Sequence, residues 1–131
     1  MIVVDTSVWI DVINATDTPK AARCVSLLED GAPVALTEII YTEILQGLRS
    51  EREARLVAGS LSGFPFLRLE TLDDFDRAAY LYRQARRAGI TIRKTLDCLI
   101  AAPCVREGVP ILHSDHDFDR LASCTELEIF E

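Results

Sequence analysis

The chain has 131 residues, of which 49% are hydrophobic and 27% are charged. This composition fits one globular domain with its own core, covering residues 1–131, and excludes a disordered chain. No apolar run approaches the roughly 20 residues of a membrane span, and the start lacks the basic and apolar regions of a secretory signal, so we expect a cytoplasmic protein.

Short apolar runs alternate with helical stretches along the chain, which is typical of an α/β fold with a mostly parallel sheet. We expect about five short strands, at Ile2–Val4, Val34–Leu36, Phe66–Leu69, Val109–His113 and Leu127–Phe130. Residues that commonly cap helices predict a helix after each of the following positions: Asp5–Ser7, Thr18, Thr37, Ser50, Thr71 and Thr95. A last short helix is expected over Phe118–Ala122.

The helix after Thr95 contains Pro103. An interior proline removes one backbone hydrogen bond and costs about 3 kcal/mol in a regular helix. We therefore predict a kink or an early end of the helix at this position.

Two carboxylates follow directly after predicted strands. Asp5 follows the strand Ile2–Val4, and Asp115 follows the strand Val109–His113, with Asp117 two residues later. Ligands of open α/β sheets bind outside the carboxyl ends of the strands. If these two strands are parallel neighbours, Asp5 and Asp115 meet at that edge of the sheet.

Two further carboxylates lie on helices that are otherwise apolar. Glu43 is flanked by Ile39, Ile40, Ile44 and Leu45, and Asp97 occupies the first turn of its helix. Taken singly, a helix cap explains Asp5 and a favourable charge in a first turn explains Asp97 better than a functional role does. Glu43 is harder to explain in this way, because no Lys or Arg lies within four residues on its face of the helix.

Taken together, these acids indicate a metal site. Several carboxylates that converge without matching cations cannot all stay ionised in a partly buried site, because like charges and burial both raise their pKa values. A divalent cation removes this conflict, and oxygen ligands favour Mg²⁺, with Mn²⁺ as the alternative.

The sequence also resembles a known family in these same places. D-T-S-V-W-I after a short strand, an E-I-L-x-G helix, a D-x-L-I-A-A helix and D-x-D-F after a late strand resemble the PIN-domain ribonucleases. The similarity is closest to the VapC toxins of toxin–antitoxin pairs, and it covers essentially the whole chain. It implies a three-layer α/β sandwich in which a central sheet of about five mostly parallel strands is flanked by helices.

The resemblance implies roles for individual residues. The family's catalytic, metal-binding acids correspond to Asp5, Glu43, Asp97 and Asp115, and the supporting residues are Thr6, Ser7 and Asp117. The implied activity is Mg²⁺-dependent hydrolysis of RNA, with tRNA or rRNA as the expected substrate. The implied partners are a VapB-type antitoxin that occludes the site and a second copy of the chain in a homodimer.

The net charge of −7 is unusual for a protein that binds RNA. However, all but two of the 14 basic residues are Arg, whose forked donors suit phosphate, and several of them cluster. We expect RNA contacts from Arg49, Arg52, Arg86, Arg87, Arg93 and Lys94.

Three alternatives need different residues. A haloacid-dehalogenase-type phosphatase requires a second acid where this chain has Ser7, and a response-regulator receiver domain requires a late Lys, whereas no Lys lies beyond Lys94. An inactive RNA-binding relative is disfavoured because the full set of acids is present.

Overall fold

The computed structural model describes residues 1–131, and it confirms an α/β architecture with a small parallel sheet. The strands are β1 (Ile2–Val4), β2 (Val34–Ala35) and β3 (Ile111–Leu112). The helices are α1 (Thr6–Ile13), α2 (Pro19–Glu29), α3 (Glu38–Gln46), α4 (Glu51–Leu61), α5 (Leu72–Arg87), α6 (Thr95–Glu107) and α7 (His116–Ala122). None of these helices combines the length and the apolar character that crossing a membrane requires.

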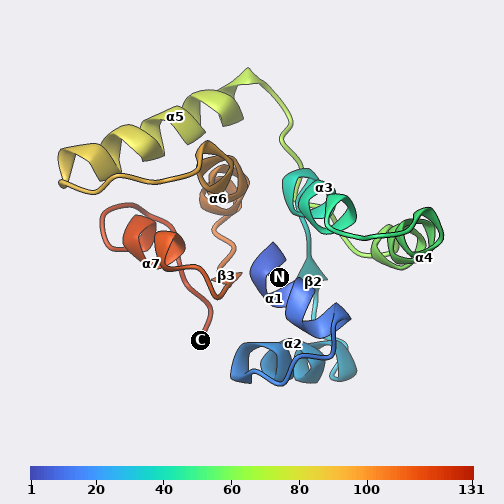
Figure 1. Ribbon diagram of the computed structural model, residues 1–131. Coiled ribbons are helices and arrows are strands. Elements are labelled where there is room, and N and C mark those ends of the chain that lie inside the picture. The colour runs from blue at the N-terminus through green and yellow to red at the C-terminus, as the bar shows by residue number, and fades with distance from the viewer.

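The strand order is β2–β1–β3, and both pairings are parallel. Figure 1 shows the helices in two groups around this sheet, with α1 to α4 on one side and α5 to α7 on the other. The strands are apolar throughout and fully or almost fully buried, as expected of a parallel sheet that is covered on both faces.

Three strands form where the sequence led us to expect about five. The two outer segments each contribute one parallel bridge instead, Phe66 to Leu36 and Ile129 to Ile111. Each segment makes two backbone hydrogen bonds to a single residue of the sheet, Leu36 or Ile111, so its pairing is limited to one residue. The order of the five segments across the sheet is still that of a parallel α/β fold.

Hydroxyl side chains start most of the helices as predicted. Thr18, Thr37, Ser50 and Thr71 each accept a hydrogen bond from a backbone N–H in the first turn of the helix that follows. The prediction for Thr95 is wrong: Thr95 is the first helical residue of α6, and Lys94 at the cap position makes no side-chain capping bond. The N-terminal N–H groups of α6 are therefore left without a side-chain acceptor.

Helix α6 does not end at Pro103, so the predicted early end is wrong. The residues around Pro103 are buried on all sides of the helix, including Ile100, Ala101 and Cys104. Packing of this kind dominates helix stability in proteins and can outweigh the cost of one proline. The helix then ends at Gly108, whose φ of 66° is readily adopted only by glycine.

A buried ion pair joins α5 to α6. The Arg106 guanidinium donates to the Asp74 carboxylate, which is almost completely buried, and also to the backbone carbonyl of Arg68. Asp74 in addition accepts from the backbone N–H of Glu70. These contacts fix the segment before α5 against the helix that carries Asp97.

We predict that Asp74→Ala lowers the free energy of unfolding by about 3 kcal/mol, because it leaves the Arg106 charge partly buried without its main partner. Urea denaturation measures this change. Asp76→Ala on the exposed face of the same helix is the matched control, with an expected change within about 0.5 kcal/mol. Equal effects of the two substitutions would contradict the structural role of the pair.

Candidate functional site

The parallel pairing of β1 with β3 places two acids at one edge of the sheet. Val4 is the register partner of Leu112, and the backbone N–H of Asp5 donates to the Leu112 carbonyl at 2.9 Å. The Asp5 Oδ2 atom accepts from the Ser7 hydroxyl at 2.7 Å and from the Ser7 backbone N–H at 3.1 Å, so Asp5 caps α1. Ser7 Oγ in turn accepts from the backbone N–H of Ser114, which connects the two strand ends.

The chain after β3 is arranged in a similar way. Asp115 Oδ1 accepts from the Asp117 backbone N–H at 3.0 Å and caps α7. The Asp115 backbone N–H donates to Nδ1 of the buried His113, whose Nε2 lies 3.0 Å from an Asp119 oxygen. Since Nδ1 accepts, Nε2 carries the proton, and burial lowers the pKa of His113. His113 is thus a neutral structural residue that orients the Asp115 backbone.

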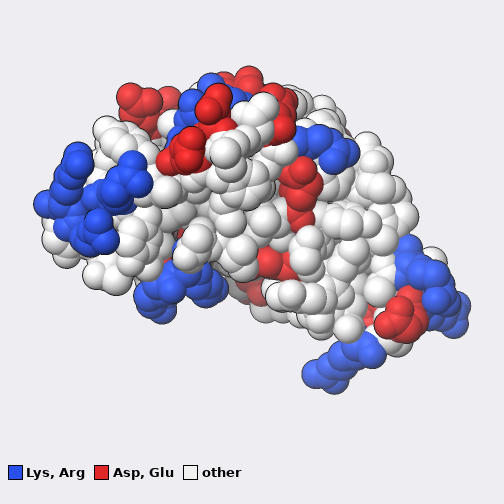
Figure 2. Space-filling view, turned by 90° about the horizontal axis from the view of Figure 1, so that it is seen from above, with Lys and Arg blue, Asp and Glu red and all other residues white.

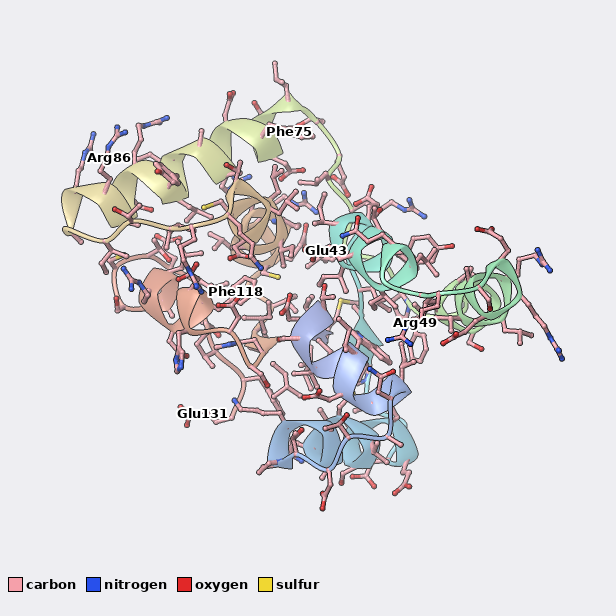
Figure 3. All side chains as sticks on the ribbon, viewed as in Figure 1. Glu43, Arg49, Phe75, Arg86, Phe118 and Glu131 are labelled. Atoms are coloured by element: carbon pink, nitrogen blue, oxygen red, sulfur yellow. The ribbon has the colours of Figure 1, made fainter.

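Glu43 reaches the same region from α3, on the side of that helix that faces α6 (Figure 3). Its Oε1 atom accepts from the Thr6 hydroxyl at 2.8 Å. Thr6 therefore orients Glu43, whereas Ser7 orients Asp5. Each of the two hydroxyl residues after β1 is paired with a different acid.

Asp97 is the one acid of the group with a buried carboxylate oxygen that makes no hydrogen bond. It is 4% exposed, and its Oδ2 atom is buried without any hydrogen-bond partner. Burial, together with the nearby charges of Asp115 and Asp5, raises the pKa of Asp97 to about 7 against the opposing effect of Lys94. Burial likewise raises the pKa of Asp5, although the hydrogen bonds from Ser7 oppose this.

A cavity of about 360 Å³ opens between these residues. It is polar, and its lining consists of Asp5, Thr6, Ser7, Ile10, Glu43, Gln46, Gly47, Lys94, Asp97 and Asp115. The four acids singled out in the sequence therefore lie around one pocket although they come from four separate parts of the chain. Asp117 lies beside this pocket but does not line it.

The donor set suits a divalent metal ion. Carboxylate oxygens of Asp97, Asp115 and Asp117 lie within 4.8 Å of one another, and Asp97 presents an oxygen with no protein partner. A buried carboxylate of this kind is costly unless it is protonated or paired. Hard cations prefer oxygen ligands of this type, so the residues present fit such an ion.

The basic residues expected to contact RNA are not gathered in one place. Lys94 lines the acidic pocket, and Arg93 is paired with Asp115 and Asp117 beside it. Figure 3 shows Arg49 beyond the end of α3 and Arg86 near the far end of α5. In Figure 2 the largest groups of basic side chains lie at opposite ends of the visible face.

Some residues of the site were not singled out in the sequence. Gln46 and Gly47 line the pocket because they follow Glu43 by about one helical turn, so the helical period was an available signal. The ion pairs of Arg93 with Asp115 and Asp117 depend on contacts between the segment before α6 and the start of α7, which are far apart in the sequence. No local sequence pattern encodes them.

We predict that the metal-free protein loses stability as the pH rises from about 4 to about 7. The pKa of Asp97 is about 7 in the folded chain against an ordinary 3.8, so in this range the folded state retains a proton that the unfolded state has released. Asp97→Asn should remove the contribution of Asp97 to this dependence, although the raised pKa of Asp5 still contributes, and should raise the free energy of unfolding at pH 8 by about 2–4 kcal/mol, at about 1.4 kcal/mol per pKa unit.

Urea denaturation in EDTA at pH 5 and pH 8 measures this difference. Asp76→Asn, in an exposed position on α5, is the control and should follow the wild-type dependence on pH. If Asp97→Asn were less stable than the wild type at pH 8, burial of the ionised Asp97 carboxylate would not destabilise the folded state.

Comparisons with known proteins agree with this geometry. The PIN domain family model matches residues 2–123. Ribonuclease VapC11 of Mycobacterium tuberculosis is 41% identical over 129 residues, which cover 98% of this chain and 96% of VapC11.

Solved structures share the fold at lower sequence identity. VapBC2 from Rickettsia felis, bound to a DNA fragment from its promoter, superposes with a TM-score of 0.77 at 16% identity, covering 99% of this chain and 98% of the other. VapC20 of M. tuberculosis, described as a sarcin–ricin loop cleaving toxin, gives a TM-score of 0.68 at 19% identity over 97% and 98% of the two chains. The family match and the identity to VapC11 establish that this chain belongs to the PIN-domain family and, within it, to the VapC ribonucleases.

Proposed function

We propose that this chain is a Mg²⁺-dependent endoribonuclease and the toxin of a VapBC-type pair, which hydrolyses RNA phosphodiester bonds and so inhibits translation and growth. The observation that carries this proposal is the buried Asp97 carboxylate, which has an oxygen without a partner at a pocket shared with Asp5, Glu43 and Asp115. A site built only for stability would have paired this charge or replaced it.

In the proposed site, Asp5, Glu43, Asp97 and Asp115 hold the ion. Carboxylate oxygens suit both Mg²⁺ and Mn²⁺, and Mg²⁺ is proposed because it is the usual ion of sites that act on phosphate groups. When bound, such an ion lowers the pKa of water and stabilises negative charge on phosphate oxygens. The acids are the metal-binding and catalytic residues of the proposal.

The remaining residues of the pocket position these acids. Ser7 fixes one oxygen of Asp5 through two hydrogen bonds, and Thr6 fixes one oxygen of Glu43. Fixed carboxylates need no reorganisation when the substrate arrives, which is the advantage of a preorganised site. The Lys94 ammonium lines the same pocket and would contact a phosphate of the RNA that enters it.

The substrate proposed is a structured RNA such as tRNA or rRNA. Support comes from VapC20, a protein of the same fold that is described as cleaving the sarcin–ricin loop. Arg49 and Arg52 follow the pocket-lining end of α3, and Arg86 and Arg87 lie in the last turn of α5. They would bind the RNA backbone on two sides of the site.

Two protein partners are part of the proposal. A VapB-type antitoxin is supported by the likeness to VapBC2, a solved toxin–antitoxin pair, and the excess of acids in the pocket suits a cationic side chain from such a partner. A homodimer is supported by exposed apolar side chains along α5, where Leu72 is 75% and Phe75 46% exposed.

We predict that RNA cleavage requires both the metal and the acids. Activity with Mg²⁺ should fall at least about 100-fold in EDTA and by a similar factor for Asp5→Asn and Asp97→Asn, as for the loss of one stabilising group in a transition state. Gel analysis of a defined total RNA pool measures cleavage, with Asp76→Asn as the control. Equal activity under all of these conditions would refute the proposal, and RNA binding without any cleavage would favour an inactive relative.

We predict that Lys94 contributes one phosphate contact. In an Asp97→Asn background, which prevents cleavage, Lys94→Ala should weaken RNA binding and reduce the slope of log K against log salt by about 0.7–0.9. Fluorescence anisotropy between about 50 and 200 mM salt measures the slope. Lys20→Ala, on α2 and outside the lining of the pocket, is the matched control. An unchanged slope for Lys94→Ala would remove this residue from the RNA interface.

A further inference from the structure

Arg93 occupies an unusual place beside the acidic pocket. Its backbone N–H and its Nε both donate to the same oxygen of Asp117, Oδ2, at 3.3 Å and 3.2 Å. Another nitrogen of the guanidinium lies 3.5 Å from Asp115 Oδ1. One Arg therefore bridges two of the three carboxylates that come within 4.8 Å of one another.

Both carboxylate oxygens of Asp117 face Arg side chains of the chain itself, whereas Asp97 and Asp115 each keep an oxygen that makes no hydrogen bond. The Asp117 side chain is 2% exposed, its Oδ2 accepts twice from Arg93, and its Oδ1 lies 3.9 Å from Arg120 Nε. By contrast, Asp97 Oδ2 is buried without a partner. The three acids thus divide into one that is neutralised by the chain itself and others that still need a cation.

The shape of the pocket gives the same division. Asp5, Asp97 and Asp115 line it, and Asp117 and Arg93 do not. The Asp115 carboxylate lies at the boundary, because its Oδ1 is taken by the Asp117 N–H and faces Arg93, while no hydrogen bond in the structure reaches its Oδ2.

A second metal ion would have to bind Asp115 and Asp117, where the Arg93 guanidinium lies. In two-metal nuclease sites the ions lie about 3.5–4 Å apart and share carboxylates. Here the side of Asp115 that faces Asp117 is closed by N–H donors, which cannot bind a metal ion. The guanidinium also neutralises the negative charge of Asp115 and Asp117 that would otherwise attract a second metal ion.

We propose that Arg93 is a built-in cation that takes the place of a second metal ion, so that the chain binds one divalent ion in the pocket lined by Asp5, Glu43, Asp97 and Asp115. Asp117 is then a positioning residue that anchors Arg93, and not a metal ligand. This inference rests on the proposed metal-dependent function and specifies the composition of its site. It also gives Arg93 a role different from the RNA contact that the sequence suggested.

The number of Mn²⁺ ions bound per chain tests this proposal, with Mn²⁺ as a spectroscopic substitute for the native ion. Titration followed by electron paramagnetic resonance and by calorimetry should give one ion for the wild type. Arg93→Met should bind two, because Asp115 and Asp117 become free to hold the second. Arg93→Lys, which keeps the charge, should still bind one, and Arg23→Met on the exposed side of α2 is the neutral control.

A second pair of variants separates Asp117 from the metal ligands. Asp117→Asn should leave the affinity for the first Mn²⁺ within about threefold, whereas Asp97→Asn should weaken it by more than about tenfold, as for the loss of a direct ligand. Thermal unfolding of each variant in EDTA checks that it is folded. This comparison remains decisive even if Arg93→Met does not fold.

The outcomes are distinct. Two ions of similar affinity in the wild type, one ion in folded Arg93→Met, or an equal loss of affinity in Asp117→Asn and Asp97→Asn would each overturn the role of Arg93 and leave the proposed ribonuclease function standing. A wild-type chain that binds no Mn²⁺ would overturn both.

Discussion

The parallel pairing of β1 with β3 is the constraint on which the site depends. The hydrogen bond from the Asp5 N–H to the Leu112 carbonyl continues this pairing one residue beyond β1. It brings the first turn of α1 next to the residues that lead into α7. Because the strands run in the same direction, their carboxyl ends cannot avoid meeting, and the acids that follow them converge. Helices α3 and α6 then add Glu43 and Asp97 from the two sides of the sheet.

Much of this arrangement could be predicted from the sequence because it depends on local signals. Apolar runs located all three strands, and hydroxyl residues located the starts of most helices. The four acids of the pocket were recognisable because each sat in an apolar context or at a strand end. What failed has a common cause: the outer strands, the cap of α6 and the continuity through Pro103 are decided by tertiary packing, which local propensity does not contain.

The contacts of Arg93 show the same limit at the site itself. In the sequence, Arg93 and Lys94 form a basic pair that indicates phosphate binding. In the structure, only Lys94 lines the pocket, and Arg93 is held against Asp117, 24 residues further along the chain. The net charge of −7 is less unfavourable for RNA binding than it first looks, because part of the acidic excess is confined to the pocket and its rim. The strongest basic groups lie elsewhere on the surface (Figure 2).

Asp5 and Asp115 both cap helices while they line the pocket. Asp5 does so with Oδ2 and Asp115 with Oδ1. A carboxylate that both caps a helix and binds a cation couples cation binding to helix formation. A cation that orders this side chain therefore also orders the first turn of α1 or α7. The extent of fraying in the first turns of α1 and α7 would therefore show whether a cation occupies the pocket. Amide hydrogen exchange at Ser7 and Asp117, whose N–H groups bond to the capping oxygens, would slow when the pocket is filled, without any change elsewhere in the fold.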